Sequence, residues 1–164
     1  MNAPDVLKYG HYEVMNAVKD LPDANWMETG VCGVWSVRDI IAHLASYEHL
    51  LVEILSTFVD GGPTPTVEKF FALGPQGFND EQVAERQSQS PEATFAEYQS
   101  TQTHTDELIV KIPLASLRQT GAIPWYGEEY DLEDIIAYSF YGHKREHCAQ
   151  IAVYRDRIAK VKAD

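Results

Sequence analysis

The chain has 164 residues, a length typical of one domain that buries a core without disulfides. Its 13 basic and 25 acidic side chains give a formal net charge of −12, which argues against nucleic acid or a membrane surface as a partner. No apolar run approaches the ~18 residues of a membrane span, and the first residues lack the pattern of a secretory signal. With two cysteines outside any C-x-x-C motif, we expect one domain over residues 1–164, located in the cytoplasm.

Apolar residues recur at spacings of three and four in several segments, which is the periodicity of amphipathic helices. The first predicted helix covers residues 7–21 and ends before a proline. The second begins at Ser36, whose hydroxyl suits a helix N-cap, and runs to about residue 59. A third helical region follows residue 80 and restarts at Ser90, a second candidate N-cap followed by a proline. The last helix begins with a capping pattern at Asp131 and runs to about residue 158.

Two long connections separate these helices. Residues 61–77 contain three prolines and four glycines with apolar side chains between them, so we expect a crossover loop that packs on the bundle and is a candidate lid. Residues 113–130 again break the periodicity, with glycines and a proline around Trp125 and Tyr126. The predicted fold is therefore all-α, a four-helix bundle with long crossover loops.

Three histidines on the expected inner faces are candidate metal ligands. His143 and His147 are four residues apart on the last helix, which separates their directions by only about 40° and places both imidazoles on one face. His43 lies among apolar residues of the second helix. Neutral imidazoles in an apolar interior are stabilised by a shared cation, and three nitrogens leave coordination positions for water or substrate. The alternative for the pair is a coincidental spacing on the surface or in the core, and the alternative for His43 is a hydrogen-bonded core histidine without a metal.

Two segments carry a family resemblance: residues 35–44, with the sequence WSVRDIIAHL, and residues 143–151, with the sequence HKREHCAQI. With their spacing and helix order, they resemble the DinB-like (DinB/YfiT) family along nearly the whole chain. Members of that family are four-helix bundles, often dimers, in which one histidine of the second helix and an H-x-x-x-H pair of the fourth bind zinc, nickel or a similar ion. The resemblance implies a homodimer in which His43, His143 and His147 hold a divalent metal ion, with zinc or nickel as the expected metals.

The resemblance also implies a function class. Known activities in the family include transfer reactions and an isomerisation that use low-molecular-weight thiols, and hydrolytic reactions. We therefore expect a metal-dependent enzyme, a thiol-dependent transferase or a hydrolase, that acts on a small molecule and has a low-molecular-weight thiol as one candidate partner. The alternative is a non-catalytic, metal-binding structural or interaction protein, in which the histidines form a closed site without an exchangeable water.

Further residues are candidates for the surroundings of the metal. Glu146 completes an H-x-x-E-H pattern, the signature of one group of zinc proteases. Only 17 residues (164 − 147) follow His147, which leaves little room for the further ligand helix of such a protease, and His43 would have no part in that site. Glu146 is therefore a candidate catalytic acid, with a surface acid or a partner of the ligands as the alternatives. Residues on the same faces as the ligands or in the second connection are candidates for substrate binding. They are Tyr47, Trp125, Tyr126 and Gln150.

Other residues of the same types are predicted to have different roles. His11 lies in the apolar stripe of the first helix, which favours a buried, hydrogen-bonded histidine. His49 and His104 have polar neighbours and are expected to be solvated. Cys148 follows a predicted ligand, but adjacent helical residues point about 100° apart, so we expect a packed thiol.

Overall fold

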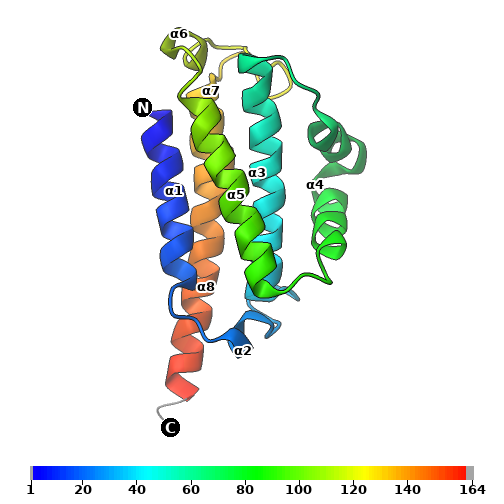
Figure 1. The fold of residues 1–164 in the computed structure, drawn as a ribbon, viewed down its shortest axis with the longest axis vertical. Coiled ribbons are helices and arrows are strands. Elements are labelled where there is room, and N and C mark those ends of the chain that lie inside the picture. The colour runs from blue at the N-terminus through cyan, green and yellow to red at the C-terminus, as the bar shows by residue number, and fades with distance from the viewer. Residues whose placement is uncertain (1, 162–164) are drawn as a thin grey trace.

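The computed structural model describes residues 2–161, and helices account for most of them (Figure 1). Four long helices form a bundle: α1 (Ala3–Val18), α3 (Val37–Val59), α5 (Pro91–Ile109) and α8 (Gly142–Val161). Residues 2–161 contain no strand, and their one extended pairing is an isolated bridge between Cys32 and Trp35. Within this same range, no helix has both the length and the apolar character needed to cross a bilayer. The all-α prediction is confirmed.

The starts of α3 and α5 follow the caps expected from the sequence. Ser36 accepts a hydrogen bond from the amide of Asp39, whose carboxylate accepts one from the amide of Ser36, so two backbone donors at the start of α3 are satisfied. Ser90 accepts a hydrogen bond from the amide of Ala93, and Pro91 occupies the first turn of α5, where no amide donor is needed. These two helices make the most extensive contact in the bundle.

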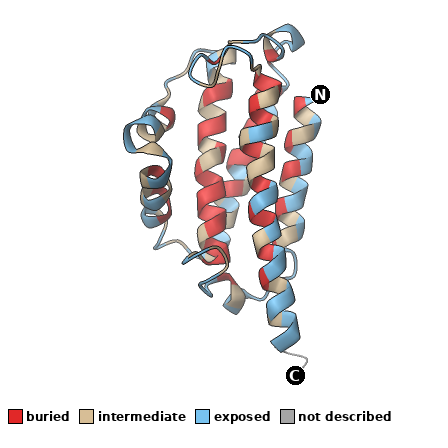
Figure 2. Ribbon diagram, turned by 180° about the vertical axis from the view of Figure 1, so that it is seen from behind, coloured by how far each residue is buried: buried red, intermediate tan, exposed pale blue. Residues whose placement is uncertain are grey.

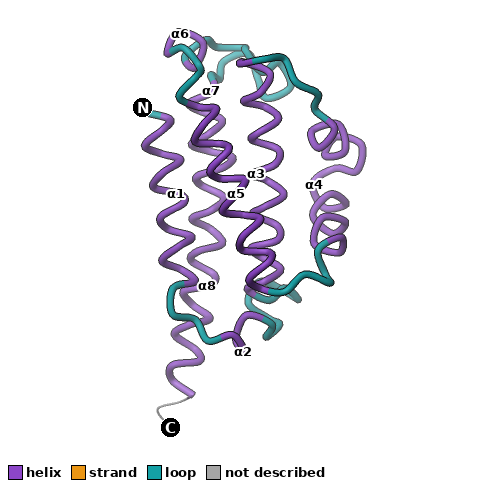
Figure 3. The backbone as a smooth tube through the Cα atoms, in the orientation of Figure 1, coloured by secondary structure: helices purple, strands orange, loops and turns teal. Residues whose placement is uncertain are grey.

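The predicted loop at residues 61–77 is wrong, because most of it belongs to a helix. α4 (Pro65–Glu85) starts with a proline in its first turn, where proline is tolerated. Gly74 interrupts α4 with φ 68° and ψ 168°, a conformation open mainly to glycine, and Pro75 restarts the helix after this kink. The residues after 80 therefore end α4 and do not begin a third bundle helix. α4 runs outside the bundle beside α3, so that α3 and α5 run in the same direction (Figures 1 and 3).

The last predicted helix is continuous but not uniform. It consists of α7 (Leu132–Ile135), the π-helical stretch η1 (Ile136–Tyr141) and then α8. Asp131 caps its start by accepting a hydrogen bond from the amide of Asp134. Stretches of π-helix are rare and are frequent at functional sites. The sequence pattern gave no indication of this one, which ends two residues before His143.

Two single-turn helices lie in the connections before α3 and after α5, which are otherwise turns and loops (Figure 3). α2 (Asp23–Trp26) links α1 to α3, and α6 (Leu114–Leu117) follows α5. The remainder of residues 113–130 has no regular secondary structure, as the sequence predicted. This loop holds Trp125 and Tyr126.

Two apolar clusters fill the bundle, and a polar layer separates them along the helices. One cluster includes Leu7, Leu51 and Ile135, and the other includes Val14 and Ile151. Burial follows the inner faces of the helices throughout (Figure 2). Each of the four bundle helices contributes to the polar layer between the clusters, which contains His11, His43, Glu48, Gln102, Thr105, His143, Lys144 and His147. Buried polar side chains need hydrogen-bond partners or a bound ion, so a functional site is expected in this layer.

Candidate metal centre

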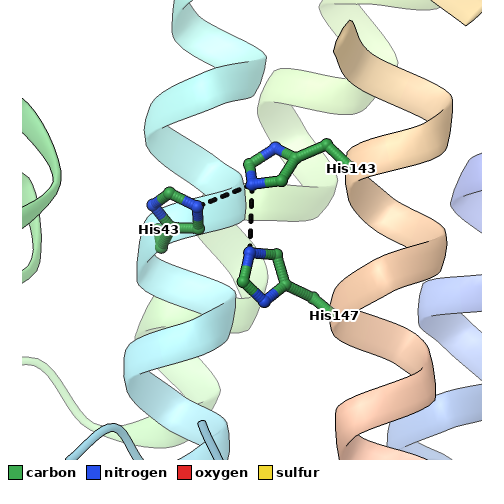
Figure 4. Close-up of side chains that lie close together, drawn as sticks. All are labelled: His43, His143 and His147. Carbon is green, nitrogen blue, oxygen red and sulfur yellow. Dashed lines mark hydrogen bonds between the residues drawn. The ribbon is translucent and has the colours of Figure 1, made fainter. Parts of the chain in front are cut away.

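Three histidine rings converge between α3 and α8 (Figure 4). His43 Nε2 lies 2.8 Å from His143 Nε2, and His147 Nε2 lies 3.0 Å from the same atom. The rings are steeply inclined, with interplanar angles of 87° for His43 and His143 and 65° for His143 and His147. One ring nitrogen of each histidine lies within 4.8 Å of the others. Three imidazole nitrogens directed at one point form the arrangement that holds a single divalent ion.

Burial keeps the three imidazoles neutral. His43 is 2% exposed, and burial together with the charges of His143 and His147 lowers its pKa to about 2. Burial, followed by the charges of His147 and Lys144, lowers the pKa of His143 to about 3. The pKa of His147 is also lowered, again chiefly by burial. A neutral imidazole offers a lone pair, so all three rings are in the form that binds metal at neutral pH.

Gln150 selects the tautomer of His147. Its Oε1 lies 2.8 Å from His147 Nδ1, which assigns the proton to Nδ1 and the lone pair to Nε2. His143 Nε2 lies close to the Nε2 atoms of both His43 and His147. A single proton on His143 Nε2 can form a good hydrogen bond to only one of these two atoms, so hydrogen bonding alone accounts poorly for both short N–N distances. A cation accepts all three lone pairs at once. The donor set therefore fits a divalent metal ion.

Two aromatic side chains pack against His43. The ring centroid of Trp35 lies 4.9 Å from that of His43 and 6.3 Å from that of His147. The ring of Tyr47 lies 4.8 Å from His43 and 4.4 Å from His143, so the structure places Tyr47 at the three histidines. Tyr47 Oη donates a 3.3 Å hydrogen bond to Asn79 Oδ1 on α4. Burial raises the pKa of Tyr47, which keeps this hydroxyl protonated and able to donate.

Two candidates on α8 lie away from the point where the nitrogens converge. Glu146 is exposed and is not among the side chains that group around this point. Cys148 is buried in the apolar cluster of Val14 and Ile151, and burial raises the pKa of its thiol to about 12. It is therefore a packed thiol, as the helical geometry predicted.

The remaining histidines differ in their surroundings. His11 is half-buried, and its Nδ1 lies 3.4 Å from the hydroxyl of Tyr98, which agrees with a hydrogen-bonded histidine. His104 is exposed, as expected. The prediction for His49 was incomplete, because its side chain is 42% exposed but its Nε2 lies 3.1 Å from Glu97 Oε1. The partner, Glu97, lies on α5 and is 48 residues away in the sequence, so residue spacing could not identify it.

A buried ion pair beside the three histidines was missed by the sequence analysis. Lys144 Nζ lies 2.6 Å from Glu48 Oε1 and donates a 2.6 Å hydrogen bond to Gln102 Oε1. Thr105 Oγ1 donates to Glu48 Oε2 at 3.1 Å. The Lys144 and Glu48 side chains are 3% and 1% exposed, so these contacts connect α3, α5 and α8 inside the bundle. One feature of the sequence could have indicated this ion pair: Glu48 lies one turn after Leu44 and therefore on the inner face of α3.

An apolar pocket of about 350 Å³ adjoins the histidines at Tyr47. Its lining residues come from α3, the first half of α4, the loop before α7, the end of α7 and η1: Tyr47, Leu50, Ile54, Val67, Phe70, Phe71, Trp125, Tyr126, Ile135, Ser139 and Phe140. The pocket thus brings together three of the four predicted substrate-binding residues. Gln150 is not among them and instead contacts His147. A separate groove between α1 and α8, lined partly by charged residues, includes none of the three histidines.

Comparison with known proteins agrees with this architecture. The family model described as the DinB superfamily matches residues 7–151, a stretch that includes all three histidines. No curated protein and no solved structure matches the chain significantly. The family match covers most of the sequence and the fold is all-helical, so the chain belongs to the DinB superfamily.

Proposed function

We propose that His43, His143 and His147 hold one divalent ion, zinc or nickel, and that the protein is a metal-dependent enzyme acting on a small molecule. The observation that carries this proposal is the convergence of three neutral Nε2 atoms on one point between α3 and α8. Membership of the DinB superfamily is compatible with such a site. Imidazole ligands suit both zinc and nickel.

A divalent ion held by three protein nitrogens can lower the pKa of a water or thiol, or polarise a carbonyl group. Thiol transfer and hydrolysis are the two reaction classes that this chemistry serves. The chain contributes neutral ligands, and Gln150 keeps the lone pair of His147 directed at the metal position. Tyr47 offers a protonated hydroxyl and an aromatic wall next to His43 and His143.

Metal content tests the first half of the proposal. We expect about one ion per chain, and alanine at any one of the three histidines should weaken metal affinity by more than about 100-fold, since a ligand loss exceeds the effect of losing a partner of a ligand. His104→Ala removes an exposed histidine and is the matched control. Elemental analysis and competition with a chelator measure both. Equal metal retention by His104→Ala and the three ligand variants would contradict the assignment.

Turnover tests the second half. The metal-loaded protein is screened against electrophiles with a panel of low-molecular-weight thiols, and separately against esters, amides and epoxides. Activity in the first set assigns thiol transfer, and activity in the second assigns hydrolysis. His143→Ala should abolish turnover in either set while far-ultraviolet circular dichroism shows a retained helical fold. Turnover that survives this variant would refute a catalytic role for the metal.

A structural metal site is the second candidate, and the burial of the ligands favours it. His43 is 2% exposed and has Trp35 and Tyr47 packed against it, as in a closed site. Structural zinc sites are filled by protein ligands, whereas catalytic sites keep an exchangeable position. Absorption spectra of a cobalt-substituted sample, recorded with and without azide as a competing ligand, distinguish the two. An unchanged spectrum together with no turnover would favour the structural role.

A further inference from the structure

The apolar pocket beside Tyr47 has a composition that restricts what it can bind. Its volume is about 350 Å³, and no charged side chain of the described residues lines it. Its polar side-chain groups are the hydroxyls of Tyr47, Tyr126 and Ser139 and the indole N–H of Trp125, and the Ser139 hydroxyl donates to the Tyr126 hydroxyl at 2.9 Å. A carboxylate or phosphate placed there would lose its hydration without gaining a cation, which is strongly unfavourable. The pocket therefore suits an uncharged, apolar group.

The pocket shares one wall, the Tyr47 ring, with two of the three histidines. The Tyr47 ring lines the pocket and lies 4.4 Å from the His143 ring and 4.8 Å from the His43 ring, measured between centroids. Ser139, which also lines the pocket, lies one turn before His143 on the same continuous helix. A molecule that fills the pocket therefore contacts the Tyr47 ring, which itself packs against the rings of His43 and His143.

The rim of the pocket consists of two aromatic side chains from segments outside the four-helix core. Phe71 of α4 is 51% exposed and Trp125 of the loop before α7 is 48% exposed. Their ring centroids lie 5.1 Å apart, and Phe70 continues the aromatic wall inward to Tyr47 at 6.2 Å. Exposed aromatic side chains at the mouth of an apolar pocket provide a surface on which an apolar ligand is partly desolvated before it enters.

We propose that this pocket binds the uncharged, apolar part of the substrate, a two-ring aromatic group or a hydrocarbon of similar size. A cavity of about 150 Å³ takes one benzene ring, so about 350 Å³ accommodates roughly twice that. The role of the bound group as a substrate rests on the metal-dependent activity proposed above. In a thiol transfer, an anionic low-molecular-weight thiol does not enter this pocket, which instead receives the partner of the thiol.

Calorimetric titration with a matched pair of probes tests the proposal. 2-Naphthol and naphthalene-2-carboxylate have the same rings, but only the second is charged at pH 7. Each is titrated into the zinc-loaded protein and into the chelator-treated protein. We expect 2-naphthol to bind both forms, and the carboxylate to bind the chelator-treated protein at least about 100-fold more weakly than 2-naphthol does, because no cationic side chain of the described residues lines the pocket.

Two rim variants locate the binding. Phe71→Ala and Trp125→Ala remove half-exposed rings, so both variants are expected to fold, and each should weaken 2-naphthol binding by about tenfold. Val153→Ala is the control, because Val153 is 71% exposed on α8 and does not line the pocket. Equal affinity of the chelator-treated protein for the two probes, or unchanged 2-naphthol binding in both rim variants, overturns the proposal.

The outcome is separable from that of the proposed function. Binding of 2-naphthol to a protein that neither holds metal nor turns over any substrate would support the apolar pocket and refute the metal-dependent activity. Metal-dependent turnover of small polar substrates without any 2-naphthol binding would support the activity and refute the apolar pocket. Tenfold weaker binding in the rim variants with unchanged metal content supports the assignment to this pocket.

Discussion

Replacing Lys144 by methionine should destabilise the fold far more than replacing an exposed lysine. Methionine keeps the length and apolar stem of the side chain but removes the ammonium group that lies 2.6 Å from Glu48 Oε1. The Glu48 carboxylate, 1% exposed, would then retain the hydrogen bond from Thr105 but lose its countercharge. Removing one partner of a buried ion pair costs about 3–5 kcal/mol of unfolding free energy. A typical domain has about 5–15 kcal/mol in total, so the loss is a large fraction of it.

Urea denaturation of the chelator-treated proteins measures this cost without a contribution from bound metal. Lys69→Met is the matched control, because Lys69 Nζ lies 2.9 Å from both Glu81 and Glu85 but at an exposed position, where ion pairs contribute less than about 1 kcal/mol. The double variant Glu48→Gln/Lys144→Met removes both charges and keeps an acceptor for Thr105. We expect it to recover at least about 2 kcal/mol relative to Lys144→Met.

Two results would refute this reasoning. A change in unfolding free energy for Lys144→Met no larger than that for Lys69→Met would show that the buried pair contributes little. A double variant no more stable than Lys144→Met would show that the cost comes from lost packing and not from an unpaired carboxylate. If Lys144→Met does not fold, the isosteric Glu48→Gln, which leaves the ammonium without its countercharge, provides the second measurement.

Three further outcomes follow from the structure. Gln150→Leu removes the acceptor of the His147 Nδ1 proton and should weaken metal affinity by about 10- to 100-fold in chelator competition, and unchanged affinity would exclude this orienting role. In the metal-free protein, urea melts should show falling stability as the pH drops below about 6.5, because the unfolded chain protonates its histidines there while the folded pKa values of His43 and His143 are about 2 and 3. Each such histidine contributes up to about 1.4 kcal/mol per pH unit, and a flat profile between pH 7 and 5 would contradict the neutral buried imidazoles. Gly74→Ala should cost about 1–3 kcal/mol because its φ of 68° and ψ of 168° disfavour a side chain, whereas Gly62→Ala, without positive φ, should cost less, and equal costs would count against a strained kink.

The sequence determined the features that depend on neighbours within one helix. The periodicity of apolar residues predicted the helical segments, and the caps at Ser36, Ser90 and Asp131 predicted where three of them begin. The pairing of His143 with His147 also follows from the helix repeat alone, since residues four apart lie on one face. These properties are local, so the order of residues is enough to specify them.

The prediction of a loop over residues 61–77 was wrong because the structural effect of a proline or glycine depends on its position within a helix. Pro65 and Pro75 lie at the starts of the two halves of α4, and Gly74 forms the kink between them. The same residues would end a helix if they stood within a regular turn. Packing of α4 against α3 stabilises helical structure where local propensity indicated a loop.

Only the tertiary structure decided which distant residues meet. It placed His43 within 2.8 Å of His143, a meeting that the sequence indicated only through the family resemblance. It also paired Lys144 with Glu48 and brought Trp125 to Phe71 at the rim of the pocket, two contacts that were not predicted from the sequence. Each of these contacts joins residues on different elements, and their positions depend on how the helices pack and on the π-helical stretch before α8. A spacing rule describes one helix at a time, whereas the geometry of a site formed by several helices is set by the burial of their inner faces against one another.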